Sequence, residues 1–305
     1  MWRCTGLRWR DGRPHWTWWL PQGPPGGPYR AGTARSSALR LGEALSLAVA
    51  EDAVRRCVGV WRGGRWTACP YEAALRAEAR RDQCERCAAL DRTSSVAADT
   101  RVDDPRPYAV YLAGFGPGLH KVGITAVARG SARLLEQAAV CFTFLGEGPL
   151  MTARRTEALL GAALEIPDRV PGAAKRAARG LLTPPPERAA ELRALYDRVA
   201  EPPDRLPESL RLRPCEVVDH GGLFGLDPAP PLPVAEVTAL LPGLGVTGTV
   251  RAIAGHDLYV DTADGCLLLD TRLTAGWPLR RATAAGCDVP TKPVAPPAQQ
   301  PQPLF

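Results

Sequence analysis

The segment YAVYLAGFGPGLHKVGIT, residues 108–125, decides how the centre of this chain folds. Apolar residues alternate along both halves, which indicates two β-strands, and the Gly- and Pro-rich middle, residues 114–118, indicates the turn that joins them. Val110 and Val122 then lie on one apolar face of the hairpin. The opposite face carries the more polar side chains of Tyr111, Lys121 and Thr125.

Two helices are expected after the hairpin. The first, RGSARLLEQAA at residues 129–139, carries three polar side chains spaced four residues apart, Arg129, Arg133 and Gln137. The second, MTARRTEALLGAAL at residues 151–164, carries Glu157 on an otherwise apolar stripe. A carboxylate in such a place is costly unless a partner satisfies it, so Glu157 is a candidate functional residue.

The order of these motifs resembles that of the GIY-YIG nuclease superfamily, in particular its branches whose second tripeptide reads Lys-x-Gly. The motifs that carry the resemblance are Ala109-Val110-Tyr111, Lys121-Val122-Gly123, Arg133 and Glu157. They cover roughly a fifth of the chain and are individually short, so their order in a strand–turn–strand–helix context gives them their weight. The whole chain also resembles an uncharacterised prokaryotic family in which such a module follows a cysteine cluster.

The resemblance implies a metal-dependent endonuclease that acts on DNA or structured RNA. Tyr111 would orient or deprotonate water, Arg133 would stabilise the developing charge, and Glu157 would hold Mg²⁺ or Mn²⁺. The catalytic set is therefore Tyr111, Lys121, Arg133 and Glu157. The substrate-binding set is Tyr108, Gly123, Thr125, Arg129 and Gln137.

Two positions depart from the superfamily pattern. Lys121 stands where the second Tyr is expected, and an ammonium group acts as a base only if its pKa is strongly depressed. Lys121 could contact phosphate instead, and Ala109 replaces the first Gly. Tyr111 could also be an ordinary strand aromatic, and Arg133 could pair with Glu157. The alternatives are thus a non-catalytic nucleic-acid-binding protein on the same scaffold, or a purely structural or protein-interaction module.

Four cysteines, Cys57, Cys69, Cys84 and Cys87, form the pattern C-x11-C-x14-C-x2-C. The C-x2-C pair is a standard half-site for tetrahedral Zn²⁺, so a structural zinc is predicted. A tight hairpin at residues 61–66 would bring the first two cysteines together, and residues 71–81 are expected to be helical. The alternatives are a redox pair in C-x2-C, or cysteines that serve only as small apolar residues.

Composition suits a cytoplasmic protein of two or three small domains, with 305 residues and 45% hydrophobic residues. Basic residues exceed acidic ones by 38 to 32, and the pI near 9.0 is compatible with a nucleic-acid partner. All but three basic residues are Arg, so Lys121 within the motif suggests that an ammonium group is needed there.

No apolar stretch is long enough to span a membrane, and the first residues lack the apolar region of a signal peptide. Nine cysteines without such a signal favour a reducing compartment. The cytoplasm and the absence of a membrane partner are therefore the expectation.

The predicted fold class is α+β. Residues 1–50 are a Trp-rich β segment, with five tryptophans in the first twenty residues that serve either as a β core or as a base-stacking platform. The remaining segments are a zinc module with connector (51–105), the GIY-YIG-like module (106–214), a small β-barrel-like domain (215–287) and a disordered tail (288–305).

Details within these segments are also predicted. Residues 21–38 are expected to be a loop, and the alternating apolar residues 39–49 a strand, with a helix as the second choice. Residues 187–200 are expected to form an amphipathic helix that packs on the hairpin. The N-terminal strands could complete the C-terminal barrel.

Overall fold

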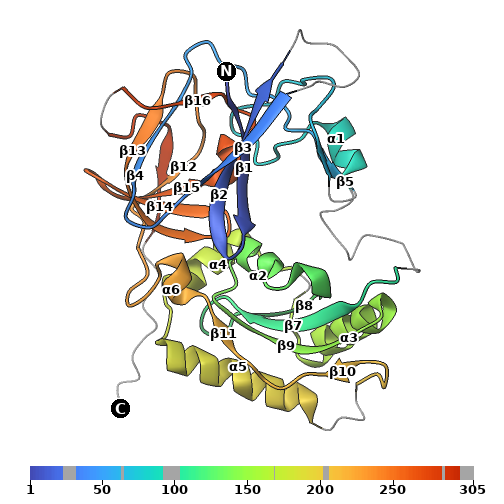
Figure 1. Cartoon of the computed structure of the whole chain (residues 1–305). Coiled ribbons are helices and arrows are strands. Elements are labelled where there is room, and N and C mark those ends of the chain that lie inside the picture. Colours follow the sequence, from blue (N-terminus) through green and yellow to red (C-terminus); the bar gives the residue numbers. More distant parts are fainter. Residues whose placement is uncertain are drawn as a thin grey trace, which may run out of the picture.

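The computed structural model describes residues 1–22, 32–62, 65–91, 104–167, 169–201, 206–283 and 286–295. It is an α+β protein in which a lobe of β-strands lies above a smaller lobe of strands and helices (Figure 1). Within these ranges, no helix combines the length and the apolar character needed to cross a membrane.

The lower lobe is built on the expected hairpin, formed by β7 (Tyr108–Gly114) and β8 (His120–Ala126). β9 (Cys141–Gly148) pairs antiparallel with β7. This strand was not predicted from the sequence. The short strands β10 (Arg211–Leu212) and β11 (Val218–Asp219) pair with β9. β11 thus belongs to the sheet of the lower lobe, although it falls within residues 215–287, the segment expected to form a barrel-like domain.

The two faces of this sheet follow the predicted alternation. One face packs against α3 (Leu150–Ala163) and α5 (Pro185–Ala200), which confirms both expected helices and the docking of the second on the hairpin. The other face is covered by α2 (Ala132–Glu136), which follows the short 3-10 helix η3 (Val127–Arg129). A single helix was expected over 129–139. It is interrupted because Gly130 adopts a positive φ of 50°.

The upper lobe contains two sheets that share one core. The first is β1 (Arg3–Arg10), β2 (Arg13–Pro21) and β3 (Gly32–Ala38), so the expected loop over 21–38 is wrong for its last seven residues. Residues 23–31 of that loop lie outside the described residues. Trp9 and Trp16 are buried in the shared core, and Trp9 Nε1 donates a 3.0 Å hydrogen bond to the carbonyl of Gly255.

The second sheet has seven strands in the order β16-β4-β13-β14-β15-β12-β17. Their bounds are β16 Leu279–Arg280, β4 Ala44–Val49, β13 Gly245–Ala254, β14 Asp257–Thr262, β15 Gly265–Asp270, β12 Ala235–Val237 and β17 Thr291–Pro293. β4 confirms the strand expected within 39–49, and β17 falls in the segment expected to be a disordered tail, of which 296–305 lie outside the described residues.

The expected barrel-like closure is wrong for the described residues. β16 and β17, at the two ends of the strand order, do not pair with each other, because each is only two or three residues long and occupies an opposite edge. The Trp-rich strands do not complete the sheet either. They hydrogen-bond among themselves and meet the C-terminal segment through Cys4, whose N–H donates to the Trp277 carbonyl at 2.8 Å.

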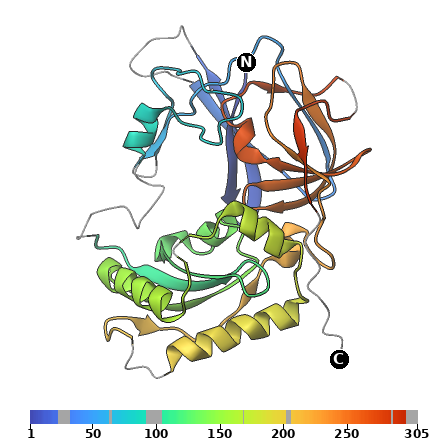
Figure 2. The same cartoon turned by 180° about the vertical axis from the view of Figure 1, so that it is seen from behind.

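α4 (Gly172–Arg179) lies between the two lobes (Figure 2). Arg179 donates to the Asp257 carboxylate and to the Tyr259 hydroxyl, both at 2.9 Å. Arg176 forms ion pairs of 2.6 Å with Asp257 and with Glu236. These charge-assisted contacts fix α4 to the upper sheet, and Ala178 of the same helix lies against Gly116 in the hairpin turn of the lower lobe.

The segment with the four cysteines contains β5 (Val60–Arg62), β6 (Arg65–Thr67) and α1 (Glu85–Leu90). The strands confirm the hairpin expected there. The helix expected over 71–81 is wrong: these residues form turns and an isolated β-bridge between Ala74 and Arg56. The buried Arg55 guanidinium donates hydrogen bonds to the backbone carbonyls of Arg76 and Ala77. In a helix, these carbonyls would instead accept bonds from backbone N–H groups of the following turn. The short helices α6 (Gly221–Phe224) and η5 (Thr271–Thr274) complete the fold.

Candidate functional site

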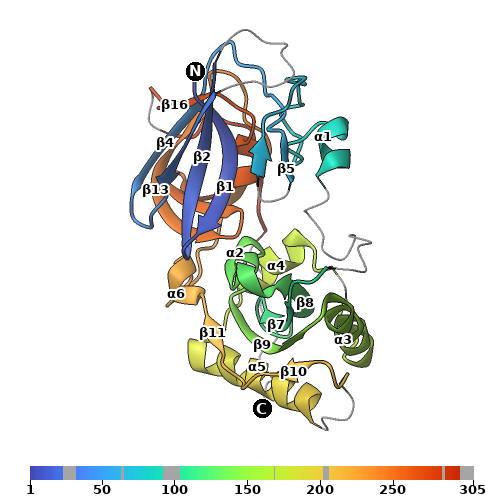
Figure 3. The ribbon, with the colours of Figure 1, turned by 45° about the vertical axis from the view of Figure 1, so that its right-hand side comes forward.

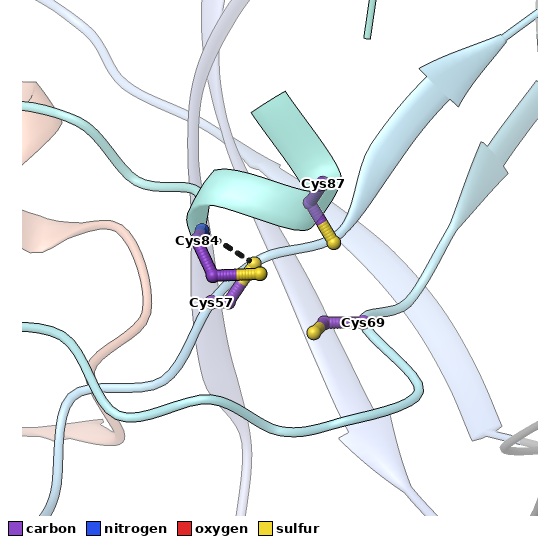
Figure 4. Close-up of side chains that lie close together, drawn as sticks. All are labelled: Cys57, Cys69, Cys84 and Cys87. Atoms are coloured by element: carbon purple, nitrogen blue, oxygen red, sulfur yellow. Dashed lines mark hydrogen bonds between the residues drawn. The ribbon is translucent and has the colours of Figure 1, made fainter. Parts of the chain in front are cut away.

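The four cysteines at 57, 69, 84 and 87 converge, and their sulfur atoms all lie within 4.8 Å of one another (Figure 4). Four thiolates at about 2.3 Å from a tetrahedral zinc ion would stand about 3.8 Å apart, so the arrangement is compatible with a zinc site. The hairpin β5–β6 positions Cys57 and Cys69, and the start of α1 positions Cys84 and Cys87. We refer to these residues as the four-cysteine cluster.

Backbone N–H groups support the sulfur of Cys57. The N–H of Cys84 donates to it at 3.2 Å, and that of Gly59 donates at 3.4 Å. Such donors favour a thiolate, whereas burial raises the pKa of Cys57 to about 12. Gly59 has a φ of +94°, and a Cβ there would lie 2.0 Å from the Thr67 carbonyl oxygen, so this turn requires glycine.

A second cluster lies on the face of β7 and β8 that α2 and α4 cover. We call it the Tyr111 cluster, and it consists of Tyr111, Lys121, Arg133, Gln137, Glu157 and Lys175. The Tyr111 side chain is 2% exposed, and its hydroxyl accepts a 2.8 Å hydrogen bond from Gln137 Nε2. Gly123 is its neighbour across the hairpin, and a Cβ there would lie 2.3 Å from the hydroxyl.

Lys175 reaches this cluster from α4. Its Nζ donates a 3.0 Å hydrogen bond to the Gln137 carbonyl and lies 3.9 Å from the centre of the Phe115 ring. Burial lowers the pKa of Lys175 to about 8, and the charges of Lys121, Arg179 and Arg133 act in the same direction. The ammonium group is therefore held among other cations, an arrangement that an anionic ligand would stabilise.

Arg133 and Glu157 both act on the Tyr111 hydroxyl electrostatically. Burial raises the pKa of Tyr111, the Gln137 hydrogen bond and the Arg133 charge oppose that rise, and the Glu157 carboxylate adds to it. Arg133 lies on α2 and has a long ion pair of 4.0 Å with Glu136. Glu157 lies half-buried on α3, which packs beside the edge strand β8. The phenol thus remains protonated, between a cation and an anion.

The structure separates the remaining expected residues. The Thr125 hydroxyl is buried on the Tyr111 side of β8, with no hydrogen-bond partner among the described residues. Arg129 is engaged with Glu136 at 2.8 Å. Tyr108 points to the opposite face of β7, where its hydroxyl donates to Asp104 at 2.8 Å.

Lys175 is the residue of this cluster that the sequence reading did not single out. It lies 18 residues beyond Glu157 and belongs to no motif, but one signal was present: it is one of only three lysines in the chain. Two of those three, Lys121 and Lys175, interact electrostatically at this cluster.

The Tyr111 cluster offers a divalent cation one carboxylate, that of Glu157. Mg²⁺ uses one or two carboxylates and completes its octahedron with water and phosphate oxygens, which Glu157 alone can satisfy on the protein side. Among the residues that the structure describes, the four-cysteine cluster is the one group of three or more potential metal ligands. The Tyr111 cluster therefore fits a weakly held ion that depends on substrate, and it does not fit a permanent one.

Fold and sites together define an α+β protein that carries a thiol cluster suited to a metal ion and a separate, largely cationic cluster around a buried tyrosine. The chain belongs to the family described as "Protein of unknown function (DUF2797)", whose model matches residues 42–279. No curated protein matches the chain, and no solved structure matches it.

Proposed function

We propose that this protein is a metal-dependent phosphodiesterase of the GIY-YIG type that acts on DNA or structured RNA. The observation that carries the proposal is the convergence of Tyr111, Arg133, Lys175 and Glu157 from four different elements, β7, α2, α4 and α3. Three of these residues, Tyr111, Arg133 and Glu157, belong to the motifs that resemble the superfamily. Lys175 adds a cation that the motifs did not require.

Each side chain has a chemical role in this mechanism. Lys121, Arg133 and Lys175 hold the phosphodiester and neutralise the charge that develops on its oxygens. The Tyr111 hydroxyl, fixed by Gln137, orients the attacking water and exchanges a proton at its oxygen. Glu157 would hold Mg²⁺ or Mn²⁺, and such an ion supplies Lewis-acid activation of the phosphoryl group when bound.

We further propose that the four-cysteine cluster binds a structural zinc ion. The distances between the sulfur atoms and the N–H donors to Cys57 support this role. The segment around the cluster has a small core of its own, made largely of the cysteines and a few neighbouring apolar residues. A metal ion would supply the free energy that so small a core lacks.

A second function, nucleic-acid binding without cleavage, is favoured by one observation. Burial raises the pKa of Tyr111, and Lys121 replaces the second tyrosine of the superfamily motif, so no side chain of the pair is an evident base. A cluster of three cations and one carboxylate is suited to binding phosphate without cleaving it. The two functions predict the same affinity and differ only in whether the strand is cut.

The deciding experiment compares wild type with Glu157→Gln on supercoiled plasmid and on a structured RNA, with Mg²⁺ or Mn²⁺, and records cleavage and binding in the same samples. Glu201→Gln, an exposed carboxylate beyond α5, serves as the matched control. Cleavage that needs the metal, survives in the control and disappears in Glu157→Gln supports the nuclease. Salt-sensitive binding without cleavage by any of the three proteins supports the binding function instead.

A further inference from the structure

A groove of about 260 Å³ lies between the three-stranded sheet β1–β2–β3 and the hairpin β5–β6. These elements lie next to each other in the upper lobe (Figure 3). Three tryptophans and two arginines provide the larger side chains of its lining: Trp18, Trp61, Trp66, Arg10 and Arg35. The groove is slightly smaller than the roughly 300 Å³ at which small-molecule pockets begin, so it suits one or two flat rings open to solvent.

The tryptophans at this groove are accompanied by guanidinium groups. The Arg35 guanidinium lies 4.2 Å from the centre of the Trp2 ring and 5.8 Å from that of Trp18. The Arg8 guanidinium lies 5.3 Å from the Trp61 ring centre. Indole rings and guanidinium planes are the surfaces on which proteins stack unpaired bases.

The charge of the groove indicates which class of ligand it binds. Of the described residues that line it none is acidic, and neither Arg10 nor Arg35 has a carboxylate within ion-pair distance in the described ranges. Both side chains are exposed. Aromatic rings interleaved with unneutralised arginines match a ligand that alternates flat bases with phosphates.

We propose that this groove binds a single-stranded segment of a polynucleotide, with bases stacked on the tryptophans and phosphates held by Arg10 and Arg35. This assignment rests on the proposed function in one respect, since it names a single-stranded segment as part of the same nucleic-acid substrate. In Figures 1 and 3, β5 lies on the same side of the molecule as β8.

The test uses the full chain in the Glu157→Gln background, which prevents cutting, and measures anisotropy of a labelled single strand of about 12 nucleotides. DNA and RNA strands are compared, each beside an abasic strand of equal length. Trp61→Leu removes the ring, and Trp61→Phe keeps one. We expect the Leu variant to lose about tenfold in affinity for the strands with bases, the Phe variant to lose less, and all three proteins to bind the abasic strand equally.

Equal affinity of Trp61→Leu and its parent for the strands with bases overturns the proposal, and so does an equal loss on the abasic strand. If Trp61→Leu loses thermal stability, the exposed Arg35→Gln decides: it must weaken binding and lower the salt slope by about one. Metal-dependent cutting by wild type with no effect of the groove variants rejects the groove alone. Base-dependent binding without any cutting rejects the nuclease alone.

Discussion

The side-chain amide of Gln137 donates a 2.8 Å hydrogen bond to the hydroxyl of the buried Tyr111. The bond holds the phenol in one orientation, and the Gln137 backbone carbonyl at the same time accepts a bond from Lys175. A residue at the end of a short helix therefore joins the strand that carries the tyrosine to the helix that carries the lysine.

Tyr111→Phe should lower metal-dependent cleavage by about 10²- to 10⁴-fold, the range for loss of a group that transfers a proton. It should cost only about 1 kcal/mol of stability, because one hydrogen bond from Gln137 is lost. Tyr196→Phe is the control. The Tyr196 hydroxyl donates to the Arg213 carbonyl, and Tyr196 packs on the face of the sheet opposite to Tyr111. An equal loss of cleavage in both variants would contradict a specific role for Tyr111.

Gly123→Ala should displace the Tyr111 hydroxyl, because the new Cβ would lie 2.3 Å from it and the buried ring has little room to move. We expect a loss of about 1–3 kcal/mol in unfolding free energy, measured by chemical denaturation, together with loss of cleavage. The control is Gly161→Ala in α3, where the nearest atom to the new Cβ is 3.6 Å away. That variant should be neutral or more stable, and a Gly123→Ala protein as stable as wild type would contradict the contact.

Lys175 should give nucleic-acid affinity a pH dependence. Its pKa is lowered to about 8, so the ammonium group is charged at pH 7 and loses its proton as the pH rises past 8. Affinity should fall between pH 7 and 9 in wild type and fall less in Lys175→Arg, which stays charged. A wild-type profile parallel to that of Lys175→Arg would show that Lys175 does not face the ligand.

The lowered pKa of Lys175 also predicts how the unfolding free energy depends on pH. The unfolded lysine has a pKa near 10.4, so between about pH 8 and 10.4 the unfolded chain binds more protons than the folded one. The contribution of Lys175 to unfolding free energy should therefore increase as the pH rises through this window. Denaturation of wild type and Lys175→Met at pH 7.5 and 9.5 measures it: the stability advantage of Lys175→Met should shrink at the higher pH.

The four-cysteine cluster should bind one zinc ion per chain. Cys84→Ser should lower the zinc content measured by atomic spectroscopy and lower the melting temperature, because three thiolates hold the ion less tightly. Cys215→Ser, a half-buried cysteine outside the cluster, should keep the full zinc content. Zinc-free wild-type protein with an unchanged melting temperature would reject the site.

The ion pair of Arg179 with Asp257 should be the strongest electrostatic link between the lobes. Arg179→Met leaves the buried Asp257 carboxylate with one fewer partner and should cost about 3–5 kcal/mol of stability. Arg40→Ala breaks an exposed pair with Glu43 and should change stability by less than about 0.5 kcal/mol. Equal effects of the two variants in denaturant titrations would contradict the role assigned to α4.

Local patterns in the sequence were sufficient for the elements that depend on local interactions. The hairpin at 108–125, the helices around Glu157 and at 187–200, and the convergence of the four cysteines were all predictable, because alternation, helical spacing and a C-x2-C turn are properties of neighbouring residues. The helix expected over 71–81 does not form because a residue distant in sequence intervenes. The Arg55 guanidinium donates hydrogen bonds to backbone carbonyls of this segment.

Tertiary structure alone decided which distant segments meet. β4 joins a sheet whose other strands lie some two hundred residues later, and Lys175 comes within electrostatic reach of Lys121 because Arg176 and Arg179 of the same helix fix α4 to Asp257. The sequence by itself determined the hairpin and its polar face. The cation that completes the Tyr111 cluster depended on buried ion pairs between segments far apart, and such pairing leaves no periodic signal along the chain.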